Sequence, residues 1–119
     1  MFKQDNSIYE FGPFRLDLAE KSLSKDGECV ALTPKAFDTL LILIERGGRL
    51  VEKEELMKRL WPDTFVEESS LSQNIYLVRK ALGEESQGVR YIETVPRRGY
   101  RFTASVREVS AGEMAVRTH

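Results

Sequence analysis

The residues best suited to bind a charged partner lie near the end of the chain, where Arg97 and Arg98 are followed by Gly99. β-prone residues flank this triplet: Tyr91, Ile92 and Val95 come before it, and Tyr100, Phe102 and Val106 come after it. The pattern predicts a β-hairpin over residues 90–106 with the two arginines in its turn. Two adjacent arginines at an exposed tip suit binding to DNA, whose phosphates are negatively charged.

A helix is predicted directly before this hairpin, over about residues 67–82. Its apolar residues fall within about 60° of one another at 100° per residue, and so form a stripe that must pack on the core: Leu71, Ile75, Val78 and Leu82. The other face carries neutral hydrogen-bonding groups and two cations, without a carboxylate: Ser69, Ser72, Gln73, Tyr76, Arg79 and Lys80. Such a face can contact base edges or phosphates. The alternative is an ordinary solvated face.

Charge is segregated along the chain, although the net charge is only −1. Residues 1–68 contain 10 Lys/Arg and 14 Asp/Glu, residues 69–107 contain 7 and 3, and residues 108–119 contain 1 and 2. Positive charge therefore gathers where the polar helix and the hairpin are predicted, as binding to a phosphate backbone requires. Chance clustering is the alternative explanation of this modest excess.

Most catalytic chemistry is disfavoured by the residues that are missing. The single histidine is His119, so a histidine general base or metal ligand would have to come from the last residue. Cys29 is the single cysteine, which rules out an internal disulfide, and its strand-like surroundings predict a buried thiol. We therefore expect neither an enzyme, nor a metal site, nor a cofactor.

The chain of 119 residues is long enough for one domain with its own core. It contains no apolar run of the roughly 20 residues that a membrane span needs and no signal-peptide core, so a cytoplasmic location is expected. We predict a disordered start over residues 1–7, a domain over residues 8–106, and a linker or flexible tail over residues 107–119.

The remaining pattern predicts an α+β fold. Short alternating apolar runs between Tyr9 and Leu32, separated by Gly12-Pro13 and by the hairpin signal Asp26-Gly27, predict an N-terminal antiparallel sheet. Thr33-Pro34 favours a helix start, and the apolar spacing that follows it continues to the Gly47-Gly48 stop. A second helix begins at about Glu52 and ends at Pro62.

Three segments of this sequence resemble the OmpR/PhoB-type winged-helix DNA-binding domain, within it the branch of CadC- and ToxR-like regulators. They are Leu32-Thr33-Pro34-Lys35 with Phe37 and Leu40-Leu41, then Leu77-Val78-Arg79-Lys80-Ala81-Leu82-Gly83, and then Tyr91-Ile92-Glu93-Thr94-Val95 running into Arg98-Gly99-Tyr100-Arg101-Phe102. The resemblance extends from Tyr9 to Val106. It implies a winged helix-turn-helix with an N-terminal antiparallel β-sheet, three helices and a C-terminal β-hairpin wing.

The resemblance also implies which residues meet DNA. The third helix would enter the major groove, with Ser69, Gln73, Asn74, Tyr76 and Leu77 on positions that face DNA and Arg79 on a position that often holds a phosphate. The wing, residues 94–100, would lie at the minor groove, with Thr94 and Tyr100 on positions that contact the DNA backbone. Trp61 matches a tryptophan that approaches phosphate, and core packing is its alternative role.

Partners other than DNA follow less directly. Because the third helix offers only two cations, we expect a single copy to bind poorly and copies to bind side by side, as a dimer on repeated half-sites. The domain at the start of the chain resembles one-component regulators, in which a sensor, and with it a membrane anchor, would follow. The alternative function is a protein-interaction module, in which the acidic segment 63–68 meets RNA polymerase.

Overall fold

The computed structural model describes residues 7–110 of the chain. They form two compact units, one made of residues 7–31 and 105–110 and the other of residues 32–104. Each unit contains its own antiparallel sheet. Of the disordered start that the sequence predicted, residues 1–6 lie outside the described part, and Ser7 is already the first residue of a strand.

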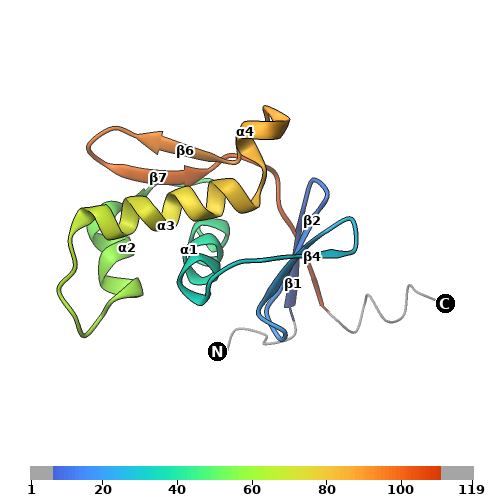
Figure 1. Ribbon diagram of the computed structural model, residues 1–119, viewed down its shortest axis with the longest axis horizontal. Coiled ribbons are helices and arrows are strands. Elements are labelled where there is room, and N and C mark those ends of the chain that lie inside the picture. The colour runs from blue at the N-terminus through green and yellow to red at the C-terminus, as the bar shows by residue number, and fades with distance from the viewer. Residues whose placement is uncertain (1–6, 111–119) are drawn as a thin grey trace. The chain divides into compact units, whose positions relative to one another are not determined.

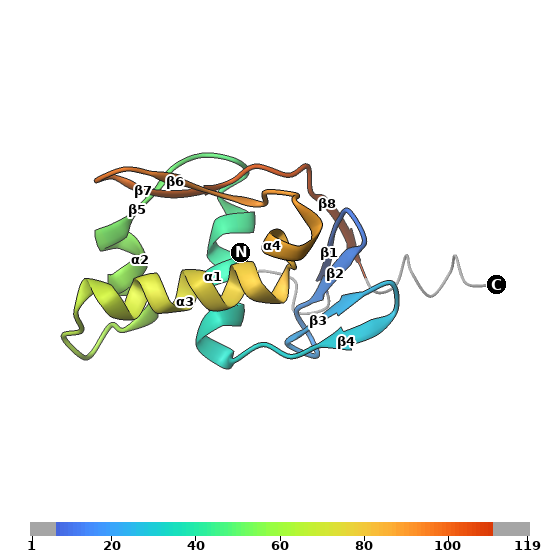
Figure 2. The ribbon, with the colours of Figure 1, turned by 45° about the horizontal axis from the view of Figure 1, so that its top comes forward.

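The first unit is a five-stranded sheet in the order β4-β3-β2-β1-β8. Its strands are β1 (Ser7–Phe11), β2 (Phe14–Asp17), β3 (Ser22–Lys25), β4 (Glu28–Val30) and β8 (Arg107–Ser110) (Figures 1 and 2). Lys25 pairs with Glu28, so Asp26 and Gly27 form a two-residue turn. Both turn residues have positive φ, 52° and 88°, as a tight hairpin of this kind requires. The predicted hairpin at Asp26-Gly27 is confirmed.

Strand β8 is a correction to the sequence prediction, which ended the domain at residue 106. Residues 107–110 pair with β1, and Ile8 and Val109 are buried cross-strand partners. The hydroxyl of Ser7 also donates to Glu108 Oε2 at 3.0 Å. The strand is short and its partner lies at the other end of the sequence, so the local pattern does not reveal it. The rest of the predicted tail, residues 111–119, lies outside the described residues.

Cys29 is a second correction, because its thiol is exposed and not buried. The register pairs Leu23 with Val30 and Ser24 with Cys29. Since neighbouring residues of a strand point to opposite faces, Cys29 lies on the face opposite Leu23, which is fully buried. The apolar neighbours of Cys29 in the sequence therefore give no information about its own burial.

The second unit combines four helices with a three-stranded sheet in the order β5-β7-β6. The helices are α1 (Pro34–Glu45), α2 (Lys53–Leu60), α3 (Glu68–Ala81) and α4 (Glu84–Gln87), and the strands are β5 (Val51–Glu52), β6 (Ile92–Val95) and β7 (Gly99–Phe102). The β6–β7 hairpin, which we call the wing, runs alongside α3 in both views (Figures 1 and 2). Every helix within residues 7–110 is too short or too polar to span a bilayer.

Helix α1 is the centre of the second unit and packs against α2, α3 and β7. It begins as predicted, with Pro34 in the first turn and the Thr33 hydroxyl accepting a hydrogen bond from the Ala36 amide at 3.2 Å. The predicted apolar stripe of α3 is also confirmed, because all four of its members are buried: Leu71, Ile75, Val78 and Leu82. Packing this stripe on α1 fixes which face of α3 remains exposed.

Helix α4 was not predicted, since three helices were expected. Gly83 ends α3 as expected, and in a left-handed conformation with φ of 71° it also becomes the N-cap of α4. The new helix has four residues, none of them buried. It therefore leaves no apolar period in the sequence.

Candidate nucleic-acid interface

The outer face of α3 is exposed as the sequence predicted, except at Arg79, which is half-buried. Its polar side chains are exposed: Ser69, Ser72, Gln73, Tyr76 and Lys80. Glu68 is the one acid of this helix; it lies in the first turn and forms an ion pair with Lys53 at 2.8 Å. From Ser69 onward, α3 thus presents hydrogen-bonding groups and a cation without a competing carboxylate.

Asn74 does not belong to this face, which corrects its prediction as a DNA-facing residue. Only 6% of Asn74 is exposed, and its side-chain amide donates to Thr39 Oγ1 at 3.2 Å. The Thr39 hydroxyl in turn donates to the carbonyl of Lys35 at 2.8 Å. A buried polar group needs such partners, so Asn74 joins α3 to α1. Its position beside the apolar stripe was the signal for this role.

Arg79 is at the inner border of the exposed face, and its guanidinium is directed to the wing. Its Nη2 donates to the Ile92 carbonyl at 3.0 Å and to Thr94 Oγ1 at 2.8 Å. Its Nε lies 3.6 Å from Glu84 Oε1. The predicted phosphate ligand is therefore already hydrogen-bonded within the second unit, and so is Thr94.

The tip of the wing presents both predicted arginines to solvent. Arg97 and Arg98 are exposed, and the Arg98 amide closes the turn by donating to the Val95 carbonyl at 2.9 Å. The Arg98 carbonyl accepts from the Lys53 amide at 3.0 Å, which joins the tip to the start of α2. Arg97 has a φ of 67°, an uncommon left-handed conformation for a residue with a side chain.

Gly99 allows the wing to approach β5 closely. A Cβ atom added at Gly99 would overlap the Val51 carbonyl oxygen and would lie 2.9 Å from Glu52 Cα. Glu52 is the cross-strand partner of Gly99, and Val51 is the partner of Tyr100. The glycine is therefore needed for β5 and β7 to pair, and this pairing supports the base of the tip.

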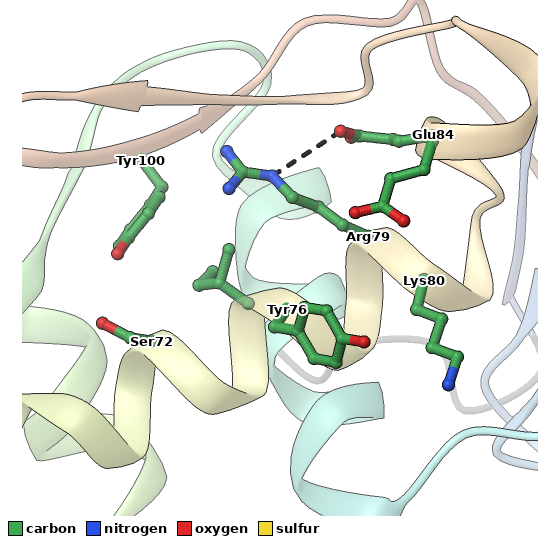
Figure 3. Close-up of a pocket in the computed structure, with 8 residues that line it drawn as sticks. Ser72, Tyr76, Arg79, Lys80, Glu84 and Tyr100 are labelled. Atoms are coloured by element: carbon green, nitrogen blue, oxygen red, sulfur yellow. Dashed lines mark ion pairs between the residues drawn. The ribbon is translucent and has the colours of Figure 1, made fainter.

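A cavity of about 310 Å³ lies between α3, α4 and the wing (Figure 3). It is lined by Ser72, Ile75, Tyr76, Arg79, Lys80, Glu84, Glu85 and Tyr100. Tyr100, a predicted wing contact, is mostly buried, with 9% of the residue exposed. The cavity thus brings predicted residues of α3 and of the wing to one place.

Two other predicted contacts, Leu77 and Trp61, are half-buried. Trp61 follows the last residue of α2, and the Lys35 ammonium lies 5.8 Å from its ring centroid. The same ammonium donates to the Leu60 carbonyl at 2.5 Å. Trp61 therefore takes part in the α1–α2 junction while keeping part of its surface exposed.

Glu84 is a residue of this region that the sequence did not single out. Its Oε2 accepts from the amides of Tyr91 and Ile92 at 2.8 and 2.9 Å, and only 10% of its side chain is exposed. Burial, together with the Glu84 charge, raises the pKa of Tyr91. In the sequence, Glu84 is one of two adjacent acids after a glycine, and nothing distinguishes it from its exposed neighbour Glu85.

Helices α1, α2 and α3 pack together, and the β6–β7 hairpin lies beside the exposed face of α3. This arrangement defines the winged-helix class of DNA-binding domains. The chain belongs to the family described as transcriptional regulatory protein, C terminal, which it matches over residues 27–102. This is the OmpR/PhoB-type DNA-binding domain, so the family predicted from the three sequence segments is confirmed.

Known relatives agree with this assignment. The chain is 37% identical over 114 residues to the transcriptional regulator HilA of Salmonella typhi, an alignment that covers 96% of this chain and 20% of HilA. The chain thus spans about one fifth of that relative.

Two solved structures share the fold. The DNA-binding domain of Escherichia coli CadC superposes with a TM-score of 0.76 at 25% identity, over 87% of this chain and 98% of that domain. The Klebsiella pneumoniae RstA DNA-binding domain, solved in complex with the RstA box, gives a TM-score of 0.69 at 26% identity, over 81% of this chain and 96% of that domain.

Proposed function

We propose that this domain binds double-stranded DNA in a sequence-specific manner and controls transcription, with α3 in the major groove and the wing at the minor groove. The observation that carries the proposal is the exposed, carboxylate-free face of α3 beside a wing tip with two exposed arginines. An α-helix with its side chains is about 10–12 Å in diameter, so α3 fits the major groove of B-DNA, which is about 12 Å wide. The role is binding, without catalysis.

Within this arrangement the polar side chains divide into two kinds of contact. Gln73 is suited to pair with adenine, and Lys80 with guanine or a phosphate, while Ser69, Ser72 and Tyr76 supply further hydroxyl groups. Arg97 and Arg98 are suited to the narrow minor groove. Since the relatives named above are bacterial, we place the domain in the cytoplasm, where bacterial DNA lies.

The small number of exposed cations supports binding by more than one copy. With Arg79 held by the wing, Lys80 is the cation that the exposed face of α3 presents. Few phosphate contacts give weak non-specific affinity, so we expect tight binding only to duplexes with repeated half-sites. A shift assay that compares one half-site with two tests this expectation.

Selection of bound sequences from random duplex DNA, followed by shift assays at increasing salt, tests the main proposal. We expect Lys80→Ala with Arg98→Ala to weaken binding and to make the slope of log K against log salt shallower, by up to about 1.8 units if each cation neutralises one phosphate, since each neutralised phosphate contributes about 0.9. The control is Arg49→Ala, which removes an exposed cation outside α3 and the wing. An unchanged slope in the double variant, or no selected sequence at all, contradicts the proposal.

A second candidate function, docking on a protein of the transcription machinery such as RNA polymerase, is favoured by Phe65. This side chain is 92% exposed in the loop between α2 and α3, two residues after Asp63 and two residues before Glu67. An exposed aromatic ring among acids suits a basic protein surface with an apolar pocket. Phe65→Ala should leave DNA affinity unchanged and lower transcription from a bound promoter. Equal loss of both activities would contradict docking.

A further inference from the structure

The outer edge of β6 is held by side chains and not by another strand. Ile92 pairs with Phe102 of β7, and the adjacent Tyr91 carbonyl accepts from the Thr103 amide at 2.8 Å. In an antiparallel pair, successive residues alternate between bonding to the partner strand and pointing away from it. The amide and carbonyl of Ile92 are therefore directed away from β7, and both find charged partners.

Glu84 holds the amide side of this edge. One of its two carboxylate oxygens, Oε2, accepts hydrogen bonds from the amides of Tyr91 and Ile92, the last residue before β6 and the first residue within it. Hydrogen bonds to an ionised acceptor are about twice as strong as those between neutral groups. The start of the wing is thereby joined to α4, which follows α3 after a single turn.

Arg79 holds the carbonyl side of the same edge. Its Nη2 bonds to the Ile92 carbonyl and to Thr94 Oγ1, two residues further along β6. The Arg79 and Glu84 side chains also form an ion pair, drawn as the dashed line in Figure 3. The two charged side chains thus bind the amide and the carbonyl of Ile92, and they also form an ion pair with each other.

We propose that Arg79 and Glu84 form a clamp that fixes the angle between α3 and the wing, and that Arg79 is a positioning residue and not a phosphate contact. This inference rests on the proposed DNA-binding function. Simultaneous binding in two adjacent grooves needs a fixed spacing between helix and wing, so the clamp sets the wing's share of affinity and of sequence preference.

Glu84→Gln distinguishes the clamp from a simple effect of charge, because the two explanations predict opposite changes in DNA affinity. Removing a negative charge beside a DNA-binding face should strengthen binding if charge alone matters. Loss of the clamp should instead weaken DNA binding, by about fivefold or more, because the charge-assisted hydrogen bonds from Tyr91 and Ile92 to Glu84 hold the start of the wing in place. Glu85→Gln is the matched control, because it removes the same charge from the next residue of α4, which lines the same cavity.

Arg79→Lys supplies a second variant that keeps the positive charge but loses the guanidinium fork. We expect its sequence preference to relax at the flanking base pairs under the wing and to persist at those under α3. The positioning role would be overturned if sequence preference weakened equally at all base pairs of the site, or if Arg79→Lys bound DNA like the wild type.

Amide hydrogen exchange without DNA completes the test. Exchange at Tyr91 and Ile92 should accelerate in Glu84→Gln and not in Glu85→Gln. Equal exchange in the two variants, or equal or tighter DNA binding by Glu84→Gln, would refute the clamp. If the wild type binds no duplex at all, the proposed function fails, while the exchange comparison still decides whether the clamp exists.

Discussion

Replacing Gly99 with alanine should separate the wing from β5. The added methyl would overlap the Val51 carbonyl and crowd Glu52 Cα, and neither backbone group can rotate away. Relief requires β5 to leave β7, which breaks ladder hydrogen bonds that contribute about 0.5–1.5 kcal/mol each. It also exposes part of Val51, which is fully buried; complete exposure of such a side chain costs about 1.5–3 kcal/mol. We expect the free energy of unfolding to fall by about 2–4 kcal/mol.

Urea denaturation followed by circular dichroism measures this loss. Arg101→Ala is the control on the same strand, because Arg101 is exposed and its ion pair with Glu93 is a surface pair that contributes less than about 1 kcal/mol. Equal stability of Gly99→Ala and the wild type would show that β5 and β7 do not need to approach as closely as described, and would refute the reasoning.

Three further predictions concern single side chains. Asn74→Ala should lower the free energy of unfolding by about 1–3 kcal/mol, because it leaves the buried Thr39 hydroxyl without its donor, while the salt slope of DNA binding stays unchanged. The Arg46 hydrogen bond lowers the pKa of Glu55 from its ordinary 4.5. The ion pair therefore stabilises the fold above pH 4.5, and this stabilisation is lost as the pH falls through the lowered pKa of Glu55. Between about pH 6 and about pH 3, the melting temperature of Glu55→Gln should consequently fall less than that of the wild type. Cys29 should react with a soluble thiol reagent in the folded protein at the rate of an exposed cysteine, and a rate that rises only in denaturant would contradict its exposure.

Much of the fold follows from local signals in the sequence. Asp26 and Gly27 adopt the positive φ angles that their turn requires, and Thr33 caps α1 with its hydroxyl. The apolar stripe of α3 is buried because its spacing places all four members on one side of the helix. These features depend on residues that are near one another in the chain, so pattern and propensity suffice.

The features that could not be predicted depend on partners that are distant in sequence or on register. Strand β8 forms because β1 is available to it, and Cys29 is exposed because Leu23 and Val30 take the buried face. In the candidate site, exposure of the helix face follows from helical periodicity, and exposure of the wing tip follows from the turn residues between two β-prone segments. The engagement of Arg79 by Ile92 does not, since the composition of a polar face does not say where a long side chain is directed.

The pairing of β1 with β8 has a consequence for how the protein folds. The hydrogen bonds Ser7 to Glu108 and Arg107 to Glu10 join residues that are 101 and 97 positions apart. Closing a loop of that length costs more entropy than any hairpin, so this ladder should form late, after the intervening 32–104 segment has collapsed and shortened the distance to be closed. The β1–β4 meander consists of adjacent hairpins and can form early. In a hydrogen-exchange experiment during refolding, the amides of β8 should therefore be the last strand amides to become protected from exchange.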